Sequence, residues 1–266
     1  MIWRTALFVS LSLVSSQAHA FFPSAPVNPP VAAVARSSVV AGGGGGGGGT
    51  PLLFAYNSGK FKQNSGTSLN VTFPDGFFST NSVVTLGILT GGTTISHVKD
   101  NRGNLWVRDS TATFSGAVTM GIYHFVATNT YLGVYNATIT INTAQTIVAG
   151  FIVSSNTNSS VALDVSTNSS GTGAVVYLGT TTATNANTGI CMSAFADNSG
   201  VNDSKTWQGP YTLVAAELDG TSFITGSIGF STGSATVPIN SAAQKGNCTL
   251  AASKTWQSIT GCFKSP

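Results

Sequence analysis

The amino-acid sequence predicts an all-β fold, a single antiparallel β-sandwich that occupies residues 52–266. Short runs of β-branched and aromatic residues recur through this region roughly every 10 to 14 residues, with Gly, Asn, Ser and Asp between them. No stretch shows the apolar period of a helix together with capping residues. A region of about 215 residues is large for a seven-stranded unit and fits a single sandwich of ten or more strands.

The first twenty residues have the three parts of a secretory signal peptide. A short MIWR segment with one positive charge precedes the apolar run ALFVSLSLV, and QAHA supplies the small residues that favour cleavage after Ala20. The apolar run is too short to span a bilayer, which takes roughly 20 residues. We therefore expect a secreted, extracellular protein without a membrane span.

Residues 21–51 have the composition of a flexible, disordered linker. The segment FFPSAPVNPPVAAVARSSVVA is rich in Pro, Ala and Val, and eight consecutive glycines follow at 42–49. Pro-rich segments act as extended spacers, while a glycine run loses much backbone entropy on ordering and has no side chain to bury. The sequence thus predicts a signal peptide (1–20), a linker (21–51) and a sandwich (52–266).

The expected strands are of two kinds. Runs such as VVTLGIL and TIVAGFIV are apolar at odd and even positions alike, which predicts central strands covered on both faces. The run NATITINT alternates between apolar and polar residues, which predicts one face in water. The expected strands are 68–73, 82–89, 116–127, 136–143, 146–155, 174–182, 190–196, 211–218, 222–231 and 255–263.

Charged residues are unusually few in this chain. They make up 7% of it, against roughly 25% in typical soluble proteins, and the formal net charge is +3. Nucleic-acid binding depends on clustered Lys and Arg, so the composition argues against it. A surface rich in Ser, Thr, Asn and Gly suits an extracellular or virion environment, and it suits carbohydrate.

The segment VKDNRGNLWVR (98–108) reads as a polar turn between two strands. Gly103 suits the left-handed position of a short hairpin connection, and Asp100 is placed to accept hydrogen bonds from backbone N–H groups of the turn. The alternative is a cation-binding turn in which Asp100, Asn101 and Asn104 supply oxygen ligands. Calcium takes 6 to 8 oxygens and usually several carboxylates. Only one carboxylate is present here, so we favour the structural interpretation.

Several of these runs, in their order, carry a resemblance to a known family. SVVTLGIL, TISHVKDNRGNLWVR, GIYHFVATN, NATITINT and TIVAGFIVSS, then the segment from VALDV to MSAFA and finally KTWQSITGCFK, resemble a β-sandwich module of secreted bacterial proteins that is also phage-associated. The resemblance covers about residues 68–264 and implies a jelly-roll or immunoglobulin-like sandwich. It supplies no catalytic residues. The cysteines and residues 233–254 depart from it.

Three cysteines, Cys191, Cys248 and Cys262, belong to the expected mature chain. Export permits a disulfide. Cys248 and Cys262 stand 14 residues apart around an expected hairpin, and we expect this pair to be bonded. A bond between Cys191 and Cys262 across adjacent strands is the alternative, with Cys191 otherwise a buried free thiol.

The sequence favours no enzymatic chemistry. His97 and His124 lie within expected strands without a nearby G-x-S-x-G elbow, and Asp219 reads as a turn residue beside Gly220 better than as a second carboxylate for Glu217. There is no C-x-x-C motif and no pair of histidines at zinc-ligand spacing. We therefore expect a protein that is not an enzyme and holds no metal or cofactor.

Exposed aromatic residues are the remaining route to function. Trp106 and Trp256 stand in expected strands and are expected in the core, whereas Trp207 and Tyr211 lie in the polar stretch DSKTWQGPYTL and are the predicted ligand-binding residues. We expect a non-catalytic extracellular binding or adhesion module whose partner is a glycan or a cell surface. The alternative is a structural protein, either a phage virion decoration or a surface appendage subunit; a glycoside-active enzyme is a weaker candidate.

Overall fold

The computed structural model describes residues 53–57, 61–73, 80, 82–129, 133–155, 163–177, 189–198, 205–208, 211–218, 225–232 and 247–264. The predicted signal peptide and linker lie outside these residues. The described part of the chain forms thirteen strands and no helix, so the all-β prediction is confirmed. The strands are β1 (Leu53–Asn57), β2 (Phe61–Phe73), β3 (Val83–Gly91), β4 (Ile95–Asp100), β5 (Val107–Phe114), β6 (Val118–Val126), β7 (Tyr135–Ser155), β8 (Leu163–Tyr177), β9 (Gly189–Asp197), β10 (Lys205–Gln208), β11 (Tyr211–Leu218), β12 (Thr225–Thr232) and β13 (Asn247–Lys264).

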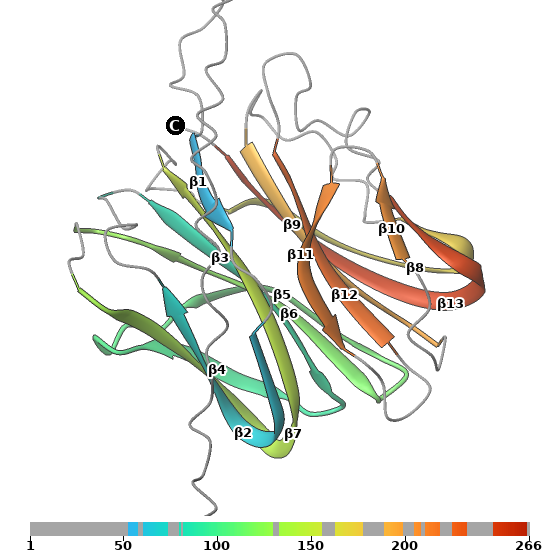
Figure 1. The fold of residues 1–266 in the computed structure, drawn as a ribbon, viewed down its shortest axis with the longest axis horizontal. Helices are drawn as coiled ribbons and strands as arrows, with labels where there is room; N and C mark the ends of the chain where they lie inside the picture. The colour runs from blue at the N-terminus through green and yellow to red at the C-terminus, as the bar shows by residue number, and fades with distance from the viewer. Residues whose placement is uncertain are drawn as a thin grey trace, which may run out of the picture. The chain divides into compact units, whose positions relative to one another are not determined.

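The first sheet is built around β7, its longest strand. β2 and β1 pair along one side of β7, while β4 and β3 pair along the other side, and β6 and β5 continue the sheet beyond β3. All of these pairs are antiparallel. Figure 1 shows β2 beside β7 as a long pair that bends where the two strands reach the lower edge of the view.

This sheet curls strongly enough to bring the two ends of β7 over one another. Phe73 pairs with Tyr135 at the start of β7, yet its ring lies 4.3 Å from the ring of Phe151, sixteen residues further along the same strand (135 to 151). A straight strand of that length would span about 50 Å. The concave face therefore encloses a core of its own, which Trp106 also enters with 5% of its surface exposed.

The second sheet repeats the strand order of the first. β8 pairs along one side of β13, β10 and β9 pair along the other side, and β12 and β11 continue beyond β9. Each strand from β8 to β13 thus occupies the place that the strand six earlier has in the first sheet. Only β1 lacks a counterpart among the described strands.

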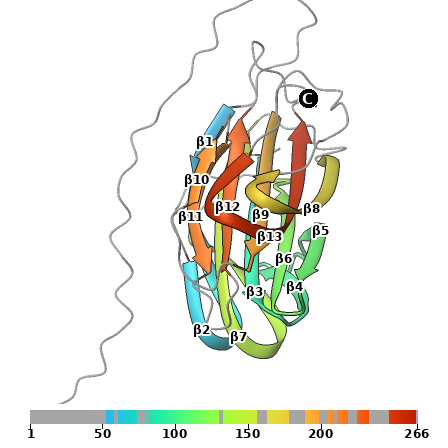
Figure 2. The ribbon, with the colours of Figure 1, turned by 90° about the vertical axis from the view of Figure 1, so that its right-hand side faces the viewer.

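The second sheet is curled as well. Tyr177 pairs with Asn247 at the start of β13, yet the Ser258 hydroxyl, eleven residues further along (247 to 258), donates a 2.7 Å hydrogen bond to the Tyr177 carbonyl. Figure 2 shows this bend of β8 and β13 toward the viewer. The concave face holds Cys191, Phe195, Trp256 and other buried residues.

The two sheets pack face to face through a shared apolar core, which completes the sandwich. Leu89, Ile122 and neighbouring residues of the first sheet meet Ile228, Phe263 and others of the second. At Gly87 the approach is so close that an added Cβ would lie 2.6 Å from Cγ2 of Ile228. β3, β6 and the second half of β7 therefore have both faces covered, as the two-sided apolar runs predicted.

The contacts between the sheets are reciprocal. β7 contacts β11 and β13 contacts β5; likewise β6 contacts β9 and β12 contacts β3. β13 is the counterpart of β7 and β5 is the counterpart of β11, so the second contact of this pair is the equivalent of the first. The same holds for the contacts of β6 with β9 and of β12 with β3. The two halves of the described chain are thus related by an approximate two-fold arrangement, like the self-complementary interface of a symmetric dimer.

The expected Cys248–Cys262 disulfide is wrong. Cys262 is bonded to Cys191, which faces it directly from β9, and Cys248 is buried and takes no part in this bridge. The expectation assumed a hairpin between Cys248 and Cys262, but residues 247–264 form one continuous strand, which places the two cysteines near its opposite ends. The pairing across adjacent strands, the alternative kept open by the sequence, is the one observed.

Candidate ligand-binding site

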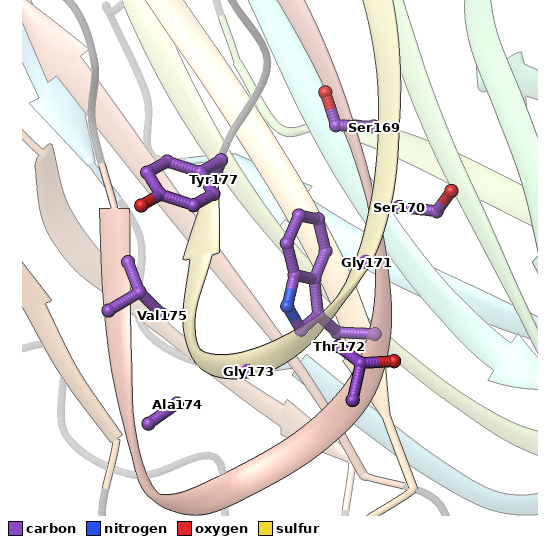
Figure 3. A pocket seen from close by; sticks show the side chains of 9 residues that line it. Ser169, Ser170, Gly171, Thr172, Gly173, Ala174, Val175 and Tyr177 are labelled. Carbon is purple, nitrogen blue, oxygen red and sulfur yellow. The ribbon is translucent and has the colours of Figure 1, made fainter.

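A hollow of about 550 Å³ opens on the curled part of the second sheet. β8 supplies eight of the residues that line it and β13 supplies Trp256. In Figure 3, β8 bends near Gly173, so that Ser169 and Ser170 lie on one limb and Tyr177 on the other, with the Ser170 side chain directed away from Tyr177. The remaining lining residues are Gly171, Thr172, Ala174 and Val175.

The lining is hydroxyl-rich and carries no charged side chain. Ser169, Ser170 and Thr172 each offer a hydroxyl group that can donate or accept a hydrogen bond. Ser170 and Thr172 are exposed, and the Thr172 hydroxyl lies 3.4 Å from that of Thr255. The hollow therefore combines polar groups of both hydrogen-bonding kinds with aromatic surface.

Trp256 forms the buried side of the hollow. Its side chain is 3% exposed, and its indole Nε1 has no hydrogen-bond partner in the described part of the chain. Gly171 lies opposite Trp256 in the ladder, and a Cβ at that glycine would stand 2.8 Å from Cζ2 of the indole. The absence of a side chain at Gly171 thus lets the ring lie flat against β8. The buried Trp106 also has an unpaired Nε1, so only the position of Trp256 in a hollow distinguishes it.

Tyr177 forms the exposed side of the hollow. It is 55% exposed, a high value for an aromatic residue, and its ring lies 6.2 Å from that of Trp256 at an angle of 57°. Its backbone is fixed by the ladder to Asn247 and by the hydrogen bond from Ser258. A rigid backbone thus presents an aromatic ring to solvent beside the hollow.

The sequence prediction selected different aromatic residues. Trp207 lies in β10 opposite Cys248, and Tyr211 begins β11 opposite Ser231. Trp207 therefore belongs to a strand rather than to the connection that the sequence suggested. β10 and β8 pair with the same end of β13, so Trp207 and Tyr177 lie in the same part of the second sheet. Tyr177 was missed because AVVYLG reads as an ordinary strand.

The predicted cation-binding turn is held together by its own hydrogen bonds. Asp100, 5% exposed, accepts at Oδ1 from the backbone N–H groups of Arg102 (2.9 Å) and Asn104 (2.8 Å). Its Oδ2 accepts from Asn104 Nδ2 (2.9 Å) and from the Tyr135 hydroxyl. The Asn101 backbone N–H donates to the carbonyl of Asn136 in β7, and its Oδ1 accepts from the Asn136 N–H. Its Nδ2 donates to the carbonyl of Val134, the residue before β7. Four donors thus occupy the carboxylate that a cation would need.

The two histidines occupy different environments. His97 is exposed on β4, whereas His124 lies between the sheets with its ring 5.4 Å from that of Phe263. His124 Nδ1 is 2.7 Å from Oδ1 of Asp109, whose side chain is fully buried. Burial raises the pKa of Asp109 above its ordinary value, while the hydrogen bond to His124 and its charge act in the opposite direction.

The Asp109–His124 pair is better explained as a packed polar contact than as a catalytic dyad. Asp109 stands at a bulge of β5, which displaces it from the regular ladder and brings it beside His124. Its Oδ2 is buried without a hydrogen-bond partner in the described part of the chain. With the Asp109 side chain at 0% exposure and that of His124 at 9%, a substrate has no access to the pair.

Two further findings concern ligands and membranes. Among the described residues, no group of three or more His, Cys, Asp or Glu side chains is arranged to hold a metal ion. Likewise, the described residues include no helix that is long and apolar enough to span a membrane. Glu217 lies in β11, and Asp219 is outside the described residues.

Comparisons with protein-family models, with curated proteins and with solved structures find no match to this chain. The hollow and the chemistry of the sequence therefore carry the functional assignment.

Proposed function

We propose that the chain is a non-catalytic extracellular binding module whose ligand is a glycan. The observation that carries this proposal is the hollow in which an exposed Tyr177 and a buried Trp256 stand beside three hydroxyl-bearing side chains. Ligand sites in proteins typically combine an apolar or aromatic surface with a few polar groups that fix the orientation of the ligand. The hollow has this composition.

The chemistry of a sugar ring fits such a surface. One face of a pyranose carries axial C–H groups and packs on an aromatic ring, while its equatorial hydroxyls need partners that donate and accept hydrogen bonds. Tyr177 offers the ring, and Ser169, on the same face of β8 as Gly171, offers a hydroxyl group that can donate and accept. The backbone of β8 holds them on one strand, so little conformational entropy is lost when a ligand binds.

The residues that line the hollow support binding of a glycan rather than its hydrolysis. Glycoside hydrolysis uses two carboxyl groups about 5 to 9.5 Å apart. None of the residues that line the hollow is an Asp or a Glu. We therefore assign it no part in bond cleavage.

The extracellular location rests on two observations. The predicted signal peptide would export the chain, and a disulfide joins Cys191 to Cys262 in the second sheet. Structural disulfides form and persist in oxidising compartments such as the extracellular space and the periplasm.

A glycan array tests the proposal. The expected mature chain, residues 21–266, is applied beside a Tyr177→Ala variant and a Val134→Ala control, which alters a residue just before β7 that is 60% exposed. We expect selective glycan binding that Tyr177→Ala weakens roughly tenfold, equivalent to about 1.4 kcal/mol, and that Val134→Ala leaves unchanged.

Two outcomes would decide against the proposal. A folded wild-type chain that binds no glycan on the array would reject it and favour the structural role in a virion or appendage. Binding that survives Tyr177→Ala but is lost in a Trp207→Ala, Tyr211→Ala double variant would keep the function and reject the hollow as its site.

A further inference from the structure

The repetition of one strand order allows the two concave faces to be compared position by position. β8, β9 and β13 enclose the second face as β2, β3 and β7 enclose the first. Two faces with the same topology would suggest two equivalent ligand sites. The residues that fill them differ, however, and this difference separates their roles.

Large apolar side chains fill the first concave face. Phe73 packs against Phe151 at 4.3 Å and against Tyr135 at 5.5 Å, and Trp106 stacks between Phe73 (5.9 Å) and Phe125 (5.8 Å). Aliphatic residues of β2, β3, β4 and β7 complete this cluster. Interiors packed in this way leave no room for a ligand.

On the concave face of the second sheet, small and polar side chains lie beside a smaller apolar cluster that includes Phe195 and Trp256. Ser193, Ser258 and Thr260 are fully buried there, and the Ser193 and Thr260 hydroxyls bond to one another at 2.7 Å. Beside them the Cys191–Cys262 disulfide joins β9 to β13. A covalent bridge thus supports a face with less apolar packing, and the hollow opens at its rim.

The hollow is also free of charge. Two charged residues pair in the ladder with residues that line the hollow, Lys254 with Gly173 and Asp197 with Trp256. Lys254 is partly exposed and Asp197 is buried, and neither lines the hollow. Anionic ligands need a cationic partner to replace the water lost on binding, and sites for sulfate or carboxylate groups use Arg or Lys for this. An uncharged lining favours a ligand without charge.

From these observations we infer that the chain binds one neutral sugar per molecule, in the hollow of its second half, while its first half serves as the scaffold. This inference rests on the proposed glycan function and makes it more specific. It predicts the charge class of the ligand, the number of sites and the half of the chain that holds them.

The test measures affinity and stoichiometry for matched ligands in solution. Lactose and sialyllactose share a core and differ by one sialic acid residue, which carries a negative charge, and maltotriose and triacetylchitotriose add neutral chains. Each is titrated by calorimetry at about 50 and 500 mM salt. We expect one site per chain, weaker binding of the charged member, and a dissociation constant that changes less than about twofold with salt.

Three variants place the site. Gly171→Ala puts a methyl group 2.8 Å from the Trp256 ring and should abolish binding. Val134→Ala, which alters an exposed residue in the first half of the chain, should retain it. Lys254→Ala should leave the affinity for neutral sugars unchanged. Thermal unfolding and near-ultraviolet circular dichroism confirm that each variant is folded, and Tyr177→Ala, which alters an exposed ring, replaces Gly171→Ala if that variant does not fold.

Each alternative result has a distinct meaning. Two sites per chain would overturn the assignment of the first half as a scaffold. Preference for the charged ligand, lost in Lys254→Ala, would overturn neutrality while the glycan function stands. Absence of binding to all these ligands and on the array would overturn both.

Discussion

The Cys191–Cys262 disulfide should stabilise the second half of the chain far more than the first. The bridge closes a loop with a sequence separation of 71 residues. In the chain-entropy treatment, a closed loop of this size lowers the free energy of folding by about 4 kcal/mol relative to the reduced chain. With a urea m-value of about 2 kcal/mol/M, reduction should move the unfolding midpoint by roughly 2 M.

Reduction of the wild-type chain is the cleanest perturbation, because it breaks one bond and removes no side chain. Urea unfolding with and without reductant gives the loss of stability. Hydrogen exchange then locates it. Amides of β9 and β13 should lose protection, whereas those of β3 and β7 should retain it because their core does not depend on the bridge.

Two cysteine variants separate the correct pairing from the one that the sequence suggested. Cys191→Ala should abolish the response to reductant, whereas Cys248→Ala should keep it, because the bridge joins Cys191 to Cys262. The opposite pattern would refute the bridge and restore the Cys248–Cys262 pairing. An unchanged midpoint on reduction of the wild type would refute the magnitude.

Two predictions concern buried carboxylates. Asp100→Asn replaces an acceptor of four hydrogen bonds by a group with two donors, so the free energy of unfolding should fall by about 1–3 kcal/mol in urea titrations; an unchanged midpoint would contradict this. For Asp109 the raised pKa means that the protonated form favours folding. The contribution of Asp109 to stability is fully present below its ordinary pKa of 3.8 and is lost as the pH rises through the folded-state pKa. Asp109→Asn should therefore gain stability relative to the wild type over that pH interval in urea titrations. A stability difference between the two proteins that does not vary with pH would count against the burial of Asp109.

The strand runs were predictable because their residues have few other options. β-branched and aromatic residues in short stretches between turn-forming residues favour strands, and runs apolar on both parities are found where both faces are covered. The two expected strands 136–143 and 146–155 instead form the single strand β7. The residues between them, Ala144 and Gln145, are exposed but include no Gly or Pro, so the chain stays extended and only bends.

The candidate site was harder to predict than the strands. The burial of Trp106 and Trp256 was expected and is confirmed, since both stand in strands. That Tyr177 approaches Trp256 depends on the curl of β8, which brings residues far apart along β13 together. The sequence of one strand predicts the alternation of its side chains but not the curvature of the sheet. The repeated strand order could not be predicted either, because the two halves differ in their side chains.

Among the described strands, each hydrogen-bonded ladder stays within one half of the chain. Every strand pair of the first sheet joins residues between 53 and 155, and every pair of the second joins residues between 163 and 264. During synthesis the first sheet can therefore close its ladders before the second has emerged, since domains tend to fold in order from the N-terminus. Until then its apolar face of Leu89, Ile122 and Ile152 stays exposed to water, and the second half of the chain acts as the cover that protects this face from aggregation.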